Sequence, residues 1–374
     1  MISIVDPVSR RPLVADTAHS LTDGVSRWPV ADGIPYLRTG REELRAEALA
    51  ALDAGDETAA LTLLLADQDD FAPLPPPDDA TIREVVASPD ATFREAMGAL
   101  NFGPVADYFA HRWSAPTFLS GVALAALYAP SHSPFVEVCC GTGQLLREFA
   151  AHGFRTAGVD LVFSKLWLGR RYLKLDRLVC ANAETLPIEA ATSATVLAHD
   201  ALYFLPDEDK AFVIAAMERT ASGGAVLAGH CHVAGHDHAG SRAYPMTVQG
   251  WCSLLPGASL IDDASLTDWF VSMGAASVPP FEGDAVVAAV SLAFGSMLAE
   301  PTPVWAPPGL VLRENPLLAS DGNGGLLPHW PSEDFAREYA DAHYLSVPDG
   351  AAEAAMPLPV RHARRTLVPL PDLW

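Results

Sequence analysis

The sequence predicts an α/β fold in which a parallel sheet carries helices on both faces. In residues 134–295, short apolar runs alternate with segments of helical periodicity. A turn containing Gly141 and Gly143 joins the first apolar run to the first helical segment. An acid, Asp160, ends the next apolar run, 19 positions after Gly141. These three observations together are typical of a doubly wound sheet with a ligand site at one edge.

The elements of this central segment follow from the positions of the apolar runs. Each run is four or five residues long, which is the length of a buried parallel strand, and the segments between the runs have helical spacing. The expected strands are 136–139, 156–159, 178–181, 195–198 and 225–229, with helices at 145–151 and 164–174.

Three further segments flank the central one. Residues 1–40 predict a small β-rich unit, because short apolar pieces are separated by turn residues. Residues 41–133 predict a helical region that covers the cleft, interrupted by prolines at 73–77. Residues 296–374 form a proline-rich carboxyl-terminal extension with one helix expected at 330–342.

Composition restricts the possible partners of the protein. The 374 residues carry a formal net charge of -22, which argues against nucleic acid and against an anionic membrane surface. No apolar stretch approaches the ~20 residues of a spanning helix. The first residues lack the features of a signal peptide, and the five cysteines are not a disulfide framework. We therefore expect a cytoplasmic enzyme.

The glycine turn indicates a particular kind of ligand. Gly141 and Gly143 allow close approach of the backbone to a ligand, and a carboxylate such as Asp160 can bind ribose hydroxyls. A nicotinamide site would need a third glycine at position 146, which is leucine. Glu137 precedes the turn and no basic group lies in it, which favours a ligand with a cationic end and no phosphate. S-adenosylmethionine is such a ligand.

On these residues the segment 134–295 resembles the class I S-adenosylmethionine-dependent methyltransferases. The resemblance implies a Rossmann-like, seven-stranded methyltransferase sheet and S-adenosylmethionine as the cofactor. It also implies cofactor contacts from the glycine motif, the ribose-binding acid, the segment after the third strand and the loop after the fourth. These positions are Glu137, Cys139, Gly141, Gly143, Asp160, Asn182, Ala183 and Asp200, with Cys139 standing where the family has its first glycine.

Residues 6–13 and 28–35 are similar to a small zinc-ribbon-like module. This module begins some ribosomal RNA guanine methyltransferases and also occurs as a free-standing methyltransferase activator. The metal-binding cysteines of such modules are absent, since the first cysteine is Cys139, so no zinc is expected here. RNA modification is an alternative function that this resemblance suggests, although the net charge weighs against it. We expect a degenerate β unit that packs on the catalytic domain, with a homodimer contact as one option.

Residues 230–238 place four histidines in nine positions. If His230 and His232 lie on a strand, their side chains share one face. Three interpretations are open: a metal site, contact with the substrate or its proton, and a solvated loop. No residue is assigned as a metal ligand.

Methyl transfer requires alignment of the acceptor and, for a hydroxyl or protonated amine, removal of a proton. The candidate catalytic residues are expected at the carboxyl ends of strands, where open α/β sheets bind ligands: His199, Asp200, His230 and His232. The helical segment before the first strand adds Tyr108, His111, Arg112 and Trp113 as possible contacts. The sequence thus predicts a methyltransferase for a small-molecule acceptor. An RNA methyltransferase and a non-catalytic regulatory protein are the alternatives.

Overall fold

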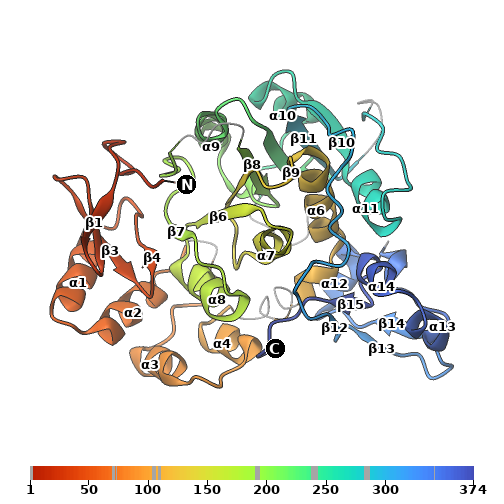
Figure 1. The fold of residues 1–374 in the computed structure, drawn as a ribbon, viewed down its shortest axis with the longest axis horizontal. Coiled ribbons are helices and arrows are strands. Elements are labelled where there is room, and N and C mark those ends of the chain that lie inside the picture. The colour runs from red at the N-terminus through yellow and green to blue at the C-terminus, as the bar shows by residue number, and fades with distance from the viewer. Residues whose placement is uncertain are drawn as a thin grey trace.

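The computed structural model describes residues 3–69, 72, 74–102, 107, 111–189, 194–236, 243–281, 287–340 and 342–374. Its centre is a seven-stranded sheet of order β10-β11-β9-β8-β5-β6-β7 (Figure 1). β5 to β9 are parallel, and β11 is antiparallel to both β9 and β10. The predicted Rossmann-like α/β fold is confirmed. The strands are β5 (Pro134–Val138), β6 (Arg155–Asp160), β7 (Leu178–Cys180), β8 (Thr195–His199), β9 (Val226–His232), β10 (Ser259–Asp262) and β11 (Ala289–Phe294).

Successive side chains of the central strands point to opposite faces of the sheet, and each face has its own hydrophobic core. Every residue of β5 is buried, and Phe135 belongs to one core while Val136 and Val138 belong to the other. The first core contains residues of α6 (Pro116–Tyr128), α7 (Gln144–Ala151), α8 (Phe163–Leu173) and α11 (Asp263–Val271). The second contains residues of α9 (Asp207–Ala221) and α10 (Val248–Leu254). The sheet therefore has helices on both faces, as predicted.

The amino-terminal unit is an antiparallel four-stranded sheet joined to the edge of the central one. Its strands are β1 (Val14–Thr17), β2 (Ser20–Thr22), β3 (Arg27–Ala31) and β4 (Ile34–Pro35), and α1 (Glu42–Asp53) and α2 (Glu57–Ala66) follow. Tyr36 pairs in parallel with Cys180, and the Leu37 N–H donates to the Cys180 carbonyl over 2.7 Å. β4 consequently lies beside β7 and covers an edge of the central sheet (Figure 1).

The remaining helices before the central sheet are short. They are α3 (Asp79–Ala87), α4 (Phe93–Ala99) and the 3₁₀ helix η1 (Arg112–Ser114), which leads directly into α6. The helix that begins with Pro116 has that proline at its first position, where a missing N–H costs nothing.

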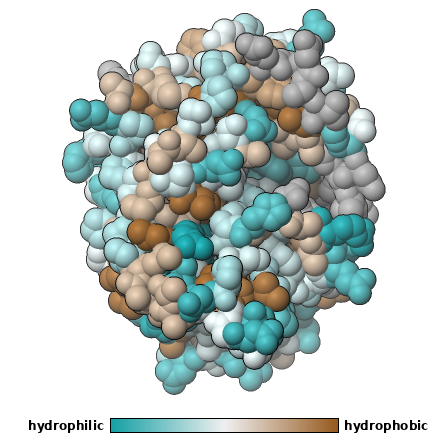
Figure 2. Space-filling view, turned by 90° about the vertical axis from the view of Figure 1, so that its right-hand side faces the viewer, coloured by the Kyte–Doolittle hydropathy of each residue, from teal (hydrophilic) through white to brown (hydrophobic). Residues whose placement is uncertain are grey.

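The carboxyl-terminal extension is built from short elements that pack back onto the central domain. They are β12 (Arg313–Glu314), β13 (Leu318–Ser320), β14 (Leu326–Pro328), α12 (Glu333–Glu338), η3 (His343–Leu345), α13 (Gly350–Ala354), α14 (Leu358–Ala363) and β15 (Leu367–Val368). The helix predicted at 330–342 is α12, and Ser332 caps it by accepting from the Phe335 N–H. On the side of the molecule that Figure 2 shows, polar and apolar residues are intermixed. Among the described residues, no helix has the length and hydropathy needed to cross a membrane.

Candidate functional site

The turn after β5 is held in left-handed backbone conformations. The φ angles of Cys139, Gly141 and Gly143 are 58°, 57° and 79°. Cys139 therefore adopts a left-handed conformation that favours glycine. A Cβ at Gly143 would lie 2.4 Å from Leu175, whereas a Cβ at Gly141 would meet no described atom within 4 Å. The space beside Gly141 suits the close approach of a ligand.

Asp160 ties this turn to the end of β6. Its Oδ2 accepts from the Gly141 N–H over 2.8 Å, and its Oδ1 accepts from the Val162 N–H over 2.9 Å. The side chain is buried. Each carboxylate oxygen has two lone pairs, so both retain capacity for a ribose hydroxyl.

Glu137 lies on β5 with its carboxyl group buried. Burial raises the pKa of Glu137 to about 8, although the nearby Arg112 guanidinium acts to lower it. Its Oε2 is buried and has no hydrogen-bond partner among the described residues. An orphaned carboxyl oxygen next to the glycine turn fits a ligand that brings a cationic donor, because a nearby positive charge would lower the raised pKa of Glu137.

The loop after β7 is bound by the amino-terminal unit. The Asn182 Oδ1 accepts from the Thr39 N–H over 2.9 Å and from the Thr39 hydroxyl over 3.1 Å. These two bonds use both lone pairs of this oxygen, which leaves the side-chain NH2 of Asn182 as its group for a cofactor contact. Ala183 is buried next to it. The same loop receives the Arg10 guanidinium, whose Nη1 donates to the Thr185 carbonyl over 2.5 Å.

Asp200 follows β8 in a left-handed conformation, with φ of 54°. Its Oδ2 is 2.6 Å from Nη2 of Arg112, and its Oδ1 accepts from the Tyr203 hydroxyl over 2.8 Å. Burial alone would raise the pKa of Asp200, but Arg112 and His230 hold it below its usual range. Asp200 is therefore a carboxylate. Arg112, from the region 41–133 that we expected to cover the cleft, forms an ion pair with it.

His230 and His232 meet Asp200 from β9. Two residues of β9, Gly229 and His230, stand opposite Ser291 of β11, and this bulge gives His230 a φ of 53°. The rings of His230 and His232 are 5.1 Å apart between centroids, and the His232 ring stacks on Tyr203 at 3.6 Å. The structure thus brings together three of the four predicted catalytic residues.

Sequence reasoning missed Asp263, the partner of His230. The Nδ1 of His230 is 2.7 Å from Oδ2 of Asp263, which also accepts from the Ser120 hydroxyl over 3.3 Å. The Oδ1 of Asp263 accepts from the Ser291 hydroxyl over 2.6 Å. The only signal in the sequence is an acidic pair that opens a helix, and this is also a common N-cap pattern.

His199, the fourth predicted catalytic residue, lies next to this cluster, with its ring centroid 6.3 Å from that of His230. Its part in catalysis stays a prediction. Its Nε2 bonds to the Thr117 carbonyl of α6. The ring lies between two glycines, because a Cβ at Gly121 or at Gly229 would be 2.6 Å or 2.3 Å from it. Burial lowers the pKa of His199 to about 4. A ring enclosed in this way packs α6 on the sheet.

The other predicted contacts have different surroundings. Trp113 is buried near Phe93, and His111 lies against Trp374 with 6.0 Å between ring centroids. His236 is half-buried and is not part of the Asp200 cluster. Tyr108 and His238 lie outside the described residues.

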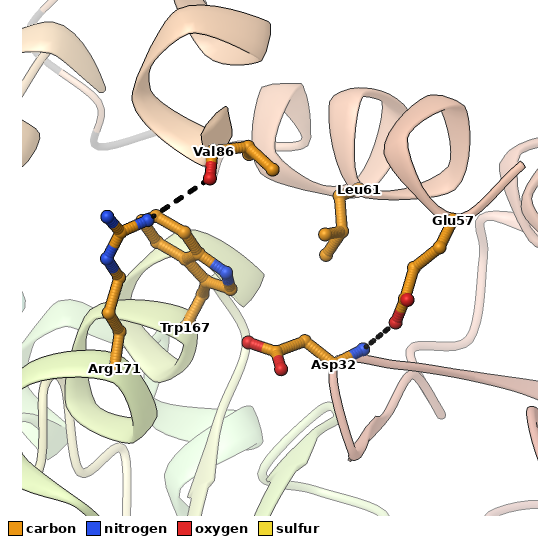
Figure 3. Close-up of a pocket in the computed structure, with 6 residues that line it drawn as sticks. All are labelled: Asp32, Glu57, Leu61, Val86, Trp167 and Arg171. Atoms are coloured by element: carbon orange, nitrogen blue, oxygen red, sulfur yellow. Dashed lines mark hydrogen bonds between the residues drawn. The ribbon is translucent and has the colours of Figure 1, made fainter. Parts of the chain in front are cut away.

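A separate recess of about 200 Å³ lies between the amino-terminal unit and α8 (Figure 3). It is lined by Asp32, Glu57, Leu61, Val86, Trp167 and Arg171. The Asp32 N–H donates to Glu57 over 3.2 Å. Trp167 and Arg171 belong to the middle and the end of α8, which starts beside Asp160 and runs away from it. The recess contains none of the predicted site residues.

Comparison with known proteins identifies a known domain in part of the chain. A family model described as a methyltransferase domain matches residues 135–224. No curated protein sequence matches the chain significantly. A solved phosphoethanolamine N-methyltransferase 2 of Haemonchus contortus, in complex with phosphomonomethylethanolamine and S-adenosylhomocysteine, shares 16% identity at a TM-score of 0.36, covering 48% of this chain and 49% of its own. This chain therefore spans about half of that structure's length.

Two further solved structures are similar to part of this chain. A TehB-like SAM-dependent methyltransferase from Corynebacterium glutamicum shares 13% identity at a TM-score of 0.35, covering 47% of this chain and 86% of its own. A complex of the Haloferax volcanii Trm112 methyltransferase activator with a putative methyltransferase shares 18% identity at a TM-score of 0.35, covering 42% of this chain and 73% of its own. None of these findings supports the resemblance of residues 1–40 to a zinc-ribbon-like module. The chain therefore contains a methyltransferase domain at residues 135–224.

Proposed function

We propose that this chain, which contains a methyltransferase domain, transfers a methyl group from S-adenosylmethionine to a small-molecule acceptor. The observation that carries the proposal is the meeting of two sets of residues at one edge of the sheet. The glycine turn with Asp160 follows β5 and β6, and the polar cluster of Asp200, His230 and His232 follows β8 and β9. Ligands of open α/β sheets bind at this edge.

The residues at this edge match the chemical parts of the cofactor. Gly141, Gly143 and the backbone of Cys139 would receive the ligand closely, Asp160 would bind the ribose hydroxyls, and Ala183 would lie at the adenine. The orphaned carboxyl oxygen of Glu137, together with Asp200, suits the cationic amino group, and Arg112 suits the carboxylate of the methionine end. The cofactor supplies a methyl group already activated by its sulfonium. The chain has to align the acceptor and handle its proton.

The acceptor is expected to meet Asp200, His230 and His232, because these polar groups converge beside the cofactor residues. Ring nitrogens and a carboxylate suit an acceptor that carries a hydroxyl or an amine, since such groups donate hydrogen bonds. The net charge of -22 favours a small molecule over RNA, whose phosphates need clustered cations.

The proposal is tested by calorimetric titration of S-adenosylmethionine into the native protein and into Asp160→Asn. The variant keeps the size of the side chain but removes the charged partner of the ribose. We expect a loss of ~2–3 kcal/mol of binding free energy, which is roughly a 30- to 150-fold weaker Kd.

Asp349→Asn is the matched control, because Asp349 also accepts from two backbone N–H groups but lies at the start of α13 in the carboxyl-terminal extension. Its affinity for the cofactor should equal that of the native protein. An Asp160→Asn protein that is folded by circular dichroism and binds with native affinity would remove Asp160 from the site. If Asp160→Asn weakens cofactor binding as expected, a screen of small-molecule extracts for transfer of a labelled methyl group would identify the acceptor.

A further inference from the structure

We propose that Asp200, His230 and His232 bind one divalent transition-metal ion at the place where the acceptor is methylated. The position next to the acceptor rests on the proposed function, but metal binding itself does not. No metal ligand was predicted from the sequence.

The geometry of the cluster is close to that of a metal site. Asp200, His230 and His232 each offer one ligand atom, and these atoms all lie within 4.8 Å of one another. Bonds of about 2.0–2.2 Å from zinc to nitrogen and oxygen place two ligand atoms of one ion at most about 4.4 Å apart. A contraction of a few tenths of an ångström therefore completes the site. Two imidazoles and one carboxylate are a ligand set of catalytic zinc and of non-haem iron, and leave positions for water or an acceptor oxygen.

His230 is held with its free nitrogen facing the other ligands. Its Nδ1 bonds to Asp263 over 2.7 Å and must carry the hydrogen, because a carboxylate only accepts. Its Nε2 faces Oδ1 of Asp200, 4.0 Å away, and in the neutral ring this nitrogen is an acceptor. A metal ion between these two atoms would be bound by both. A carboxylate on the far nitrogen of a histidine is also the usual outer support of a metal ligand.

The other two ligands are also fixed by neighbours. Asp200 is anchored through Oδ2 by Arg112 and through Oδ1 by the Tyr203 hydroxyl, and His232 stacks on the Tyr203 ring with 6° between the ring planes. Asp200 and His230 both have positive φ, which costs a non-glycine residue about 1–3 kcal/mol and is concentrated at functional sites. The fold therefore holds these three side chains together although two of the residues have strained backbone conformations. A solvated loop would not be held in this way.

The test is metal binding by the full chain after removal of metal with a chelator. Co²⁺ is titrated in and followed by its visible absorbance, and Zn²⁺ is titrated in a calorimeter. We expect one equivalent to bind saturably and to be removed again by chelator. His232→Gln should abolish this binding, and Asp263→Asn should weaken it roughly 10- to 100-fold because the outer support of His230 is lost.

His132→Gln is the matched control, since His132 is exposed and its described contact is with the Gly153 carbonyl. It should bind Co²⁺ like the native protein. The inference is overturned if the folded native protein binds no metal, or if His232→Gln and Asp263→Asn bind as tightly as His132→Gln. Titration of S-adenosylmethionine into the metal-free protein separates this result from a failure of the proposed function, because cofactor binding without metal binding leaves the methyltransferase assignment standing.

Discussion

The carboxyl-terminal extension is joined to the methyltransferase domain by a fully buried ion pair, and this pair supports a strong prediction. Arg365 follows α14 and Glu148 lies in α7; both side chains are 0% exposed, with Nη1 3.1 Å from Oε1. Burial alone would raise the pKa of Glu148, but Arg365 and His362 outweigh it and hold it at about 2. Oε2 of Glu148 has no hydrogen-bond partner within the described chain. The carboxylate therefore depends on these two neighbours.

Replacing Arg365 by methionine keeps much of the apolar volume between Phe118 and Phe270 but removes the charge. We expect the free energy of unfolding to fall by about 3–5 kcal/mol, because a buried carboxylate is left uncompensated. Adding Glu148→Gln removes that carboxylate and should restore most of the loss. Arg337→Met is the surface control: its pair with Asp334 has side chains 68% and 74% exposed, so the change should cost at most about 1 kcal/mol.

The assay is guanidinium unfolding at neutral pH, followed by tryptophan fluorescence. The reasoning is refuted if Arg365→Met is no more costly than Arg337→Met. It is also refuted if the double variant is less stable than the single one, since the loss would then come from packing and not from the orphaned charge.

Three further predictions follow from buried contacts. Burial lowers the pKa of His362 to about 4, below its unfolded value, so between pH 6.5 and 4 the unfolded chain binds the proton and the folded chain does not. Stability should therefore fall as pH is lowered through this window, by up to about 3 kcal/mol from this group, and a flat profile in equilibrium unfolding would contradict it. Thr39→Val removes one hydrogen bond to Asn182 and should weaken cofactor binding about 3- to 10-fold in calorimetry, whereas Thr22→Val, whose hydroxyl bonds to Ser26, should not. Gly121→Ala should destabilise the fold by about 1–3 kcal/mol, because its Cβ would be 2.6 Å from His199, while Gly98→Ala, with no described atom within 4 Å, should be neutral or stabilising in the same unfolding experiment.

The sheet was predictable because its signals are local. Each central strand is a short apolar run, and each lies between residues of helical spacing, so the runs at 136–139 and 195–198 correspond to β5 and β8. The position of Asp160 at the end of β6 is predictable for the same reason. Cys139 shows what residue types alone do not predict, because this cysteine has a positive φ of 58°, a conformation that favours glycine.

The site was less predictable, because its contacts join residues far apart in the chain. Asp263 reaches His230 only after β11 has paired with β9 and β10, and no spacing in the sequence encodes this. His199 was expected in the cleft because it ends a strand. Alternate residues of a strand face opposite sides of the sheet, and this residue faces α6 while its neighbour Asp200 turns toward the cluster.

The amino-terminal unit also makes contacts that join residues far apart in the chain. The loop of residues 182–189 follows β7, and the unit contacts it from two directions: Thr39 binds Asn182, while Val5 and Arg10 bind the carbonyls of Pro187 and Thr185. These bonds fix both the start and the end of the loop that we propose to lie at the adenine. Because β4 also extends the sheet at β7, the unit cannot be removed without exposing that edge. Residues 3–39 therefore hold in place the loop of the proposed cofactor site. This role does not need the metal-binding cysteines that these residues lack.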